Sequence, residues 1–301
     1  MDPVAQIQEG MEGPQLNRIA SEHESRISFG RLWRSKSLLL GGVIVGVILL
    51  TALFAPILAP YNPNGQDYSA ILQAPSLKHW FGTDDLGRDI FSRVLVGART
   101  SMEVSFGAMV VGLIVGVPVG LLSGYYRGFL DDWVIMRIVD ALQAFPFLIL
   151  ALVLAAMLGP GIGNAMIAIG VGYLPIFVRT VRAQVIAEMR KEYVEAARVV
   201  GVSDWRIMRV HIFPNVTTPL IVQAAIAMGS GIVAEASLSY LGLGVEPPTA
   251  SWGSMLHTAQ GYMTDSPWFA IVPGVAIVIA VLGFNLLGEG LQDWFDPKAN
   301  E

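Results

Sequence analysis

Long apolar runs without a single charge most constrain what this chain can fold into. Residues 38–59 and 104–126 contain no charged side chain, and neither do residues 141–178. A helix that crosses a membrane needs about 20 mostly apolar residues, so each run is long enough to span a bilayer. Charged residues make up only 14% of the 301 residues, against about 25% in a typical soluble domain. The sequence therefore predicts a helical membrane protein.

The apolar runs divide into six predicted spans. The run at residues 141–178 is too long for one helix, and its glycine-rich segment 159–164 breaks it in two. The predicted spans cover residues 38–59, 104–126, 133–158, 165–181, 217–238 and 268–288. An even number of spans places both chain ends on the same side of the membrane.

Basic residues indicate which side of the membrane each loop faces. They gather before the first span, at the start of the third, and between the fourth and fifth. Lys78, Arg88, Arg93 and Arg99, in contrast, share one long loop with acidic residues that can balance them. Loops rich in Lys and Arg are typically cytoplasmic. We therefore expect the N-terminal tail (residues 1–37), the C-terminal tail (296–301) and the loop 182–215 to face the cytoplasm.

Two segments are predicted on the extracytoplasmic side. Residues 60–100 begin with a turn-rich connector and continue with an amphipathic helix in the membrane interface, before the second span. The apolar stripe of this helix consists of Leu86, Ile90, Phe91, Val94 and Leu95. Residues 242–267 are rich in Gly, Pro, Ser and Thr and are expected to fold as a loop over a pore mouth. The other five spans and the loop 182–215 form a predicted core at residues 101–295.

The loop between the fourth and fifth spans contains a charged helical segment. Residues 188–200 can form a helix, because Lys191, Glu195 and Arg198 stand at spacings that bring opposite charges together on a helix surface. Gly201 suits a left-handed residue just past the end of that helix. The first half of this loop is thus predicted as one helix with a glycine stop.

A second short helix is predicted directly after the glycine. Ser203 is a suitable N-cap, Asp204 suits the first helical turn, and Pro214 is expected to stop the helix. Two helices that meet at a glycine form an elbow, and the paired alanines in the first helix let another backbone approach closely. We call residues 188–213 the elbow and interpret it as a docking element, with an ordinary solvated loop as the alternative.

Several motifs outside the elbow point to one family. They lie at residues 79–89, 136–140, 144–146, 239–244, 247–248, 252–253 and 284–293. Together they closely resemble the second membrane subunit of the dipeptide and oligopeptide importers, which are ATP-binding-cassette (ABC) transporters. The resemblance extends from about residue 38 to the C-terminus. The chain departs from the family pattern at His211, Phe213, Glu289 and Gln292, and none of these changes puts the family in doubt.

The resemblance also implies a role for the elbow. In ABC importers, a Glu-Ala-Ala sequence followed by a glycine and a proline at this spacing marks the loop that binds the ATPase. The residues thereby assigned to ATPase coupling are Glu195, Ala196, Ala197, Gly201, Ser203, Asp204, Trp205, Arg209 and Pro214.

The fold and the partners follow from the same resemblance. It implies an all-α subunit with six transmembrane helices, the type I ABC importer permease fold, in the inner membrane of a bacterium. The implied partners are a homologous permease subunit, two ATPase chains and an extracytoplasmic peptide-binding protein. ATP and Mg²⁺ would bind to the ATPase chains. The chain itself would be a transport subunit and not an enzyme, with no cofactor and no nucleic acid bound to it.

Patterns for catalysis or metal binding are weak. The chain has no cysteine, which excludes thiolate metal sites and cysteine nucleophiles. The basic segment 30–37 lacks the second glycine of a phosphate-binding loop, and a span follows it instead of a soluble helix. The four histidines have no ligand-like spacing. A Gly-x-Ser-x-Gly motif, which serine hydrolase chemistry would require, is absent from the sequence.

Three polar residues in or near the spans are candidates for the translocation path. Ionisable groups in hydrocarbon are costly and usually face a partner or water. For Asp140, a local ion pair with Arg137, three residues earlier on the same helical face, is favoured over substrate contact. Glu235, late in the fifth span, suits path lining and partner contact equally. Asn285 suits packing between helices better than substrate contact.

The sequence leaves the transported substrate open. A nickel path would be expected to use soft or imidazole clusters, which the chain lacks. Sparse path groups of mixed polarity suit cargo with varied side chains, so di- and oligopeptides are favoured over nickel, glutathione and sugars. An ion-gradient-driven secondary transporter is the alternative from another class. It would favour broken helices and acidic residues at mid-membrane, and it would leave the elbow without a role.

Overall fold

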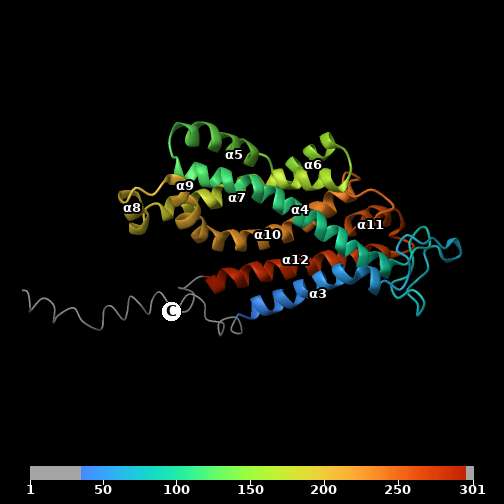
Figure 1. Ribbon diagram of the computed structural model, residues 1–301. Helices are drawn as coiled ribbons and strands as arrows, with labels where there is room; N and C mark the ends of the chain where they lie inside the picture. The colour runs from blue at the N-terminus through green and yellow to red at the C-terminus, as the bar shows by residue number, and fades with distance from the viewer. Residues whose placement is uncertain (1–34, 296–301) are drawn as a thin grey trace, which may run out of the picture.

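The computed structural model describes residues 35–295 (Figure 1). The predicted C-terminal tail and residues 1–34 of the predicted N-terminal tail, with most of the basic residues before the first span, lie outside the described residues. Five helical segments are long and apolar enough to cross a membrane. They are α3 (Lys36–Leu58), α4 (Ile90–Tyr125), α7 (Ile162–Glu188), Asp204–Tyr240, which includes α10 (Phe213–Tyr240), and α12 (Pro267–Phe295). A bent pair, α5 (Met136–Gln143) and α6 (Phe147–Leu158), makes six spans if counted as one. The predicted all-α fold is confirmed.

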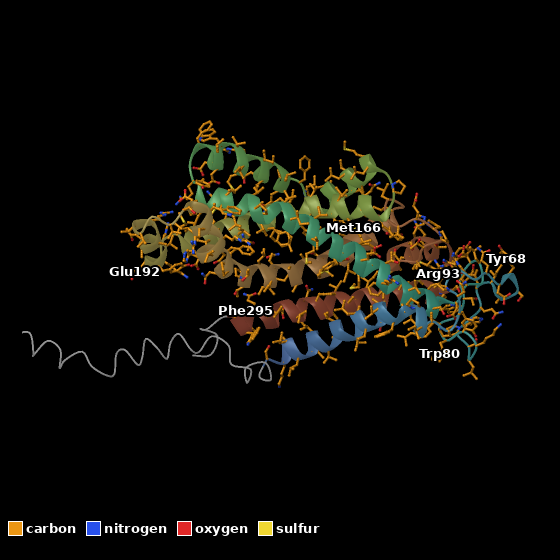
Figure 2. All side chains as sticks on the ribbon, in the orientation of Figure 1. Tyr68, Trp80, Arg93, Met166, Glu192 and Phe295 are labelled. Atoms are coloured by element: carbon orange, nitrogen blue, oxygen red, sulfur yellow. The ribbon has the colours of Figure 1, made fainter. Side chains whose placement is uncertain are left out.

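The helices form an elongated bundle with two different ends (Figure 1). One end carries the short helices α8 (Glu192–Val199) and α9 (Asp204–Arg206) of the elbow. The other end carries the long connection between α3 and α4 and the short helix α11 (Trp252–Ala259). Figure 2 shows Glu192 at the first end, and Tyr68 and Trp80 at the second. We call them the elbow end and the loop end.

Close packing of α4 on α7 holds the centre of the bundle. A stripe of glycines on α4 recurs every four residues, at Gly112, Gly116, Gly120 and Gly124. A Cβ atom at any of these positions would lie 2.7–2.9 Å from the Cβ of an α7 residue. The α7 partners, also four residues apart, are Tyr173, Phe177, Val181 and Val185. Small residues let membrane helices approach closely, so this stripe fixes α7 and the elbow to which it leads.

The third span is not the single helix predicted for residues 133–158. A π-helical turn at Leu130–Ile135 leads into α5, and the segment ending with α5 meets α6 at an angle of 93°. The break falls at residues 144–146. Pro146 explains it, because proline disfavours the helical conformation in the residue before it and directs the chain into a turn. Apolar composition indicated one span, but composition does not reveal a bend.

The prediction of a separate amphipathic helix before the second span is wrong. α4 begins at Ile90 and runs without a break to Tyr125, whereas Leu86 lies in the turn before it. The Asp89 carboxylate caps α4 by accepting a 2.8 Å hydrogen bond from the backbone amide of Ser92. With 36 residues at about 1.5 Å each, α4 is longer than the roughly 30 Å hydrocarbon layer. α4 is therefore too long to lie upright within that layer over its whole length.

The predicted loop over the pore mouth also contains regular structure. Residues 252–259 form α11, which begins with a capping box. The Ser251 hydroxyl accepts from the backbone amide of Ser254, and the Ser254 hydroxyl accepts from the amide of Ser251. These reciprocal hydrogen bonds satisfy backbone N–H groups that have no partner within the first turn of a helix. A Ser-rich segment whose composition predicts a loop can therefore begin a short helix.

Candidate functional site

The elbow consists of two short helices between α7 and α10. α7 ends at Glu188 and α8 begins at Glu192, so the single helix predicted over residues 188–200 is interrupted. The backbone amide of Lys191 donates to the carbonyl of Glu188 at 3.0 Å, and Lys191 itself has an extended conformation. The chain therefore turns before the Glu-Ala-Ala segment as well as after it.

Gly201 ends the first elbow helix in the left-handed conformation that the sequence predicted, with φ at +82°. The Gly201 amide donates to the carbonyl of Arg198 (2.9 Å), and the Val202 amide donates to that of Ala197 (3.0 Å). This is the Schellman pairing of helix C-termini. No atom lies within 4 Å of the place where a Cβ would be. The glycine is therefore required by the backbone conformation and not by lack of space.

Ser203 and Pro214 differ from their predicted roles. Ser203 occupies the N-cap position of α9 in an extended conformation, but its hydroxyl makes no capping hydrogen bond. Pro214 does not stop a helix, because it lies in the first turn of α10 and the helical segment continues through it. A π-helical turn at Ile207–Ile212 joins α9 to α10. The second elbow helix and the fifth span are therefore one continuous helical segment.

An apolar core inside the elbow fixes it to the bundle. The side chains of Val194, Ile207 and Ile212 are fully buried in one cluster with residues of α7. At the end of α4, the Tyr125 hydroxyl donates a 2.6 Å hydrogen bond to the carboxylate of Asp204. The two elbow helices are thus anchored to both α4 and α7.

The outward side of the elbow exposes large apolar side chains. Val199, Val200 and Trp205 are 83%, 82% and 66% exposed. Every residue that the sequence assigned to coupling is exposed as well, except Ala197, which is half-buried. Exposed apolar patches rimmed by polar residues mark protein interaction sites. The structure therefore brings the predicted coupling residues together on one accessible element.

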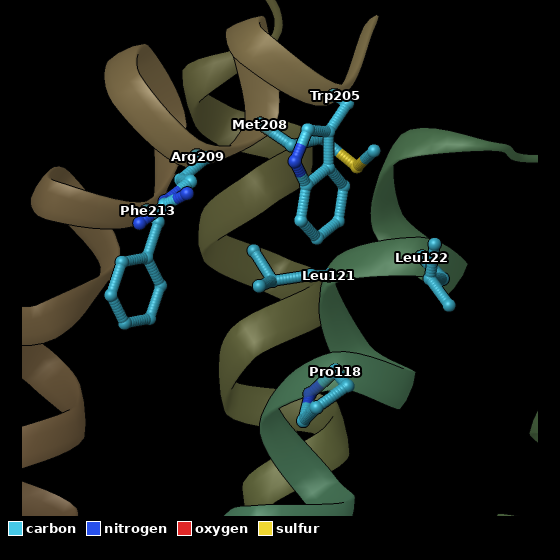
Figure 3. Close-up of a pocket in the computed structure, with 7 residues that line it drawn as sticks. All are labelled: Pro118, Leu121, Leu122, Trp205, Met208, Arg209 and Phe213. Carbon is cyan, nitrogen blue, oxygen red and sulfur yellow. The ribbon is translucent and has the colours of Figure 1, made fainter.

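An apolar pocket of about 400 Å³ lies beneath Trp205 (Figure 3). Trp205, Met208 and Phe213 line it from the elbow and α10, and Leu121 and Leu122 line it from α4. The pocket leaves the Trp205 indole free of close packing on this side. The indole is therefore held less tightly than the buried elbow core and has room to change its orientation.

A second set of contacts, which sequence reasoning missed, holds the base of the elbow. Arg182 of α7 forms a 2.5 Å ion pair with Asp131, whose buried carboxylate also accepts a hydrogen bond from Ser123. The buried Glu188 carboxylate accepts a hydrogen bond from the Tyr193 hydroxyl. Burial, followed by this hydrogen bond, raises the pKa of Tyr193 to about 12. Arg182 and Asp131 are 51 residues apart, so no local pattern signals their pairing.

Comparison with known families settles what kind of protein this is. The family described as binding-protein-dependent transport system inner membrane component matches residues 116–301, which is more than half of the chain. The chain belongs to this family of membrane permeases. A second family, the N-terminal transmembrane domain of oligopeptide transport permease C, matches residues 25–75 of the permease.

Individual relatives agree with this assignment. A dipeptide transport system permease protein from Alkalihalophilus pseudofirmus is 43% identical over 273 residues, which cover 91% of this permease and 90% of the relative. A glutathione transport system permease protein from Pectobacterium atrosepticum is 41% identical over 269 residues, 89% of each chain. A solved chain of the inward-facing MetNI methionine ABC transporter has a TM-score of 0.55 at 22% identity, covering 65% of this permease and 93% of that chain. The predicted family and the ABC importer permease fold are confirmed.

Among the predicted path residues of the permease, Asp140 has a different partner from the one expected. Arg179 of α7 forms an ion pair with Asp140 at 2.5 Å, and the two side chains are 45% and 48% exposed. The guanidinium of Arg137 instead lies 5.4 Å from the centre of the Trp133 ring. The predicted local pair between Arg137 and Asp140 is therefore wrong, because a neighbouring helix supplies the cation.

Glu235 is fully buried within the permease and joins three helices. Its carboxyl group accepts 2.8 Å hydrogen bonds from Ser101 of α4 and Ser239 of α10. The Ser101 hydroxyl also accepts from the backbone amide of Trp252 in α11 (3.2 Å). Asn285 is exposed on α12. In the described part of the chain, no hydrogen bond or ion pair joins any two of Asp140, Glu235 and Asn285.

Proposed function

We propose that this permease forms one half of the translocation path of an ATP-driven importer for di- or oligopeptides. The observation that carries the proposal is the elbow, a firmly anchored helical element that exposes Val199, Val200 and Trp205. Membership of the permease family supports the transport role. Relatives named for dipeptide and for glutathione transport support a peptide cargo, since glutathione is itself a short peptide.

The complete importer has four further protein components. A homologous permease subunit supplies the other half of the path, two ATPase chains dock on the elbows, and an extracytoplasmic binding protein delivers the peptide. ATP and Mg²⁺ bind to the ATPase chains, and this permease contributes no cofactor site. The complex resides in the bacterial inner membrane.

The elbow end faces the cytoplasm in this proposal. Its support is the excess of Lys and Arg in the loops at that end. The described chain ends agree, because α3 begins and α12 ends toward the elbow end (Figures 1 and 2). A backbone contact supports this placement, since a Cβ at Gly290 would lie 2.5 Å from the Cα of Leu38.

Motion would pass from the ATPases to the path through continuous helices. When the ATPases close on ATP, they push the elbow, and the uninterrupted segment Asp204–Tyr240 carries the push along the fifth span. α7 moves with its glycine-packed partner α4. The path then opens alternately to the outside and to the inside. Coupling is a free energy between two sites, so the elbow must make different contacts in the two states.

Purification from detergent tests the class of transporter. We expect a tagged permease to retain the homologous permease and the ATPases. A secondary transporter is the alternative, and the break between α5 and α6 is a feature that such proteins share. Transport by the lone chain, driven by an ion gradient, would favour that alternative and contradict the proposal.

Uptake measurements test the cargo. A strain that lacks this chain is compared with its parent, using labelled di- to pentapeptides, glutathione and nickel side by side. We expect the loss of peptide uptake. Unchanged peptide uptake, with loss of glutathione or nickel uptake, would show that the peptide assignment is wrong and leave the importer assignment intact.

A further inference from the structure

A cleft at the loop end of the permease has no role in the coupling described above. It lies between α3, α4 and α10 and has a volume of about 480 Å³, which is within the range of roughly 300–1,000 Å³ for small-molecule sites. Most of its wall is apolar. The residues that matter below are Leu49 and Leu53 of α3, Phe106 of α4, Met228 of α10, and the charged Arg99 and Glu103 of α4.

Arg99 and Glu103 carry opposite charges, and both are exposed. Among residues 35–295, neither has an ion-pair partner. They stand one helical turn apart, but Arg ahead of Glu is the weaker order for pairing on a helix. The nearby Arg88 and Arg93, in contrast, are buried and lie 2.6 and 3.4 Å from a carboxylate oxygen of Asp84. The two charges in the cleft are therefore available to a ligand.

The cleft lies between the middle of the bundle and the loop end. Glu103 directly precedes the charge-free run that starts at Val104. Leu53 is in the last turns of α3, which ends at Leu58, on the side away from the elbow. The cleft is therefore near the outer boundary of the hydrocarbon layer. Ionisable residues within membrane-spanning helices are rare and often mark a ligand or water path.

We propose that this cleft holds a short peptide by its two charged termini, with Arg99 binding the carboxylate and Glu103 binding the ammonium group. The proposal rests on the importer function proposed above. A guanidinium binds a carboxylate through two parallel hydrogen bonds, and the Glu103 carboxylate accepts hydrogen bonds from the ammonium group. The apolar wall receives side chains without selecting one, and the flexible Met228 adapts to their shape.

The spacing of the two charges also sets a preferred length. Cβ atoms one helical turn apart are separated by about 5–6 Å, and long side chains extend that reach. An extended peptide spans at most about 3.3–3.6 Å for each residue, so a di- or tripeptide can reach both charges at once. Longer peptides reach only one of them, and their uptake depends less on the pair.

The test measures uptake by the complete importer with saturating binding protein. One labelled dipeptide is supplied in its free, C-amidated and N-acetylated forms, and each rate is divided by the wild-type rate so that the binding protein's own preference cancels. We expect Arg99→Gln to lower uptake of the free and acetylated forms at least about tenfold, because it removes two charge-assisted hydrogen bonds to the carboxylate. The amidated form should keep the wild-type rate. Glu103→Gln should spare only the acetylated form.

If the wild-type importer takes up neither the C-amidated nor the N-acetylated dipeptide, a variant that exchanges the two charges provides the test instead. Arg99→Glu alone should abolish most uptake of the free dipeptide. The double variant Arg99→Glu/Glu103→Arg should restore at least half of it, because a peptide can bind in the reverse direction. Failure of the exchange to restore uptake would overturn the proposal.

Matched controls separate this role from a structural one. Lys78 and Glu246 are exposed charges outside the cleft lining, and Lys78→Gln and Glu246→Gln should transport normally. Equal losses for all three dipeptide forms, loss of the partner permease on purification, or normal uptake by all cleft variants would each overturn the proposal. A wild-type importer that takes up no peptide at all would instead contradict the proposed function.

Discussion

The two ends of the permease are held together in different ways. At the loop end, the connection between α3 and α4 has little regular structure, yet buried charges fix it. Asp84 pairs with Arg88 at 2.6 Å, and His79 lies 2.9 Å from Asp89, with all four side chains largely buried. At the elbow end, regular helices pack on a small apolar core but leave Val199, Val200 and Trp205 exposed.

This difference separates a connection fixed by its own buried charges from an element that is proposed to dock onto a partner. The connection between α3 and α4 at the loop end pairs its buried charges with one another, which holds its shape without another protein. The elbow end packs its inner side and leaves Val199, Val200 and Trp205 exposed, and an ATPase would cover them in the proposed importer. Changes at the loop end should therefore lower the stability of the permease, and changes at the elbow end should lower its affinity for the ATPases.

The largest effect is expected at the loop end. The Asp84 carboxylate accepts 2.9 Å hydrogen bonds from the backbone amides of Leu86 and Arg88, in addition to its ion pair. Asp84→Ala removes the carboxylate closest to the buried Arg88 and Arg93, and breaking a buried ion pair in this way costs about 3–5 kcal/mol. We expect a clearly lower unfolding temperature of the purified permease, measured in detergent without ATPases.

Asp85 provides the control for that substitution. Burial, followed by the neighbouring negative charge of Asp84, raises the pKa of Asp85. Because the folded-state pKa lies above the unfolded value, ionised Asp85 disfavours folding at neutral pH. Asp85→Asn should therefore leave the unfolding temperature unchanged or raise it. Equal losses from both substitutions would show that Asp84 has no special place in the network.

Two exposed tryptophans test the comparison at both ends. Trp205 in the elbow is 66% exposed and Trp80 at the loop end is 60% exposed; Trp80 also packs against Phe91, with ring centres 5.0 Å apart. Interface tryptophans often contribute 2 kcal/mol or more, so Trp205→Ala should weaken ATPase binding roughly 30-fold. Trp80→Ala should not change it. Titration of the permease with purified ATPase measures both, and equal weakening would contradict the assignment of docking to the elbow.

A smaller loss is expected from backbone strain at the glycine of the elbow. Gly201→Val places a β-branched residue at a φ of +82°, a conformation that costs about 1–3 kcal/mol for such residues. ATPase binding should fall several-fold while the spans still insert. Gly201→Asn is the matched control, because asparagine tolerates left-handed backbone better. Since no atom crowds the site, equal loss from both would indicate that φ is not the cause.

Much of the fold could be predicted from the sequence because its signals are local. Charge-free runs of about 20 residues mark spans wherever they occur, and the glycine of the elbow marks its turn by its own conformational freedom. The sequence did not predict the bend at Pro146 or the continuous start of α4. Apolar composition shows which residues can lie in the membrane, but it does not show where a helix bends or begins. The four-residue spacing of the glycines at residues 112–124 is visible in the sequence, but the sequence does not show that they pack against α7.

The polar contacts were predicted less well, because their partners are distant in sequence. Asp140 was paired with a residue three positions away, whereas its partner Arg179 is 39 positions away. The charges of the cleft were assigned to a balanced loop, since the sequence does not show that Arg99 lies within a helix against α3. Local patterns therefore predicted the two helices and the glycine turn of the elbow, and the tertiary structure was needed to find the polar pairs.

The smallest effect is expected between the two ends, at the ion pair of Asp140 and Arg179. Both side chains are about half exposed, and exposed ion pairs contribute only about 0–1 kcal/mol because water screens them. Asp140→Asn should barely change the unfolding temperature, whereas Asp131→Asn, which removes a buried partner of Arg182, should lower it several degrees. A large loss of stability from Asp140→Asn would show that this pair acts like the buried charges of the loop end.

Uptake is measured with the same variants, and we expect Asp140→Asn to transport close to normally. Normal stability with strongly reduced uptake would instead place Asp140 on the translocation path, as a charge left exposed for a ligand.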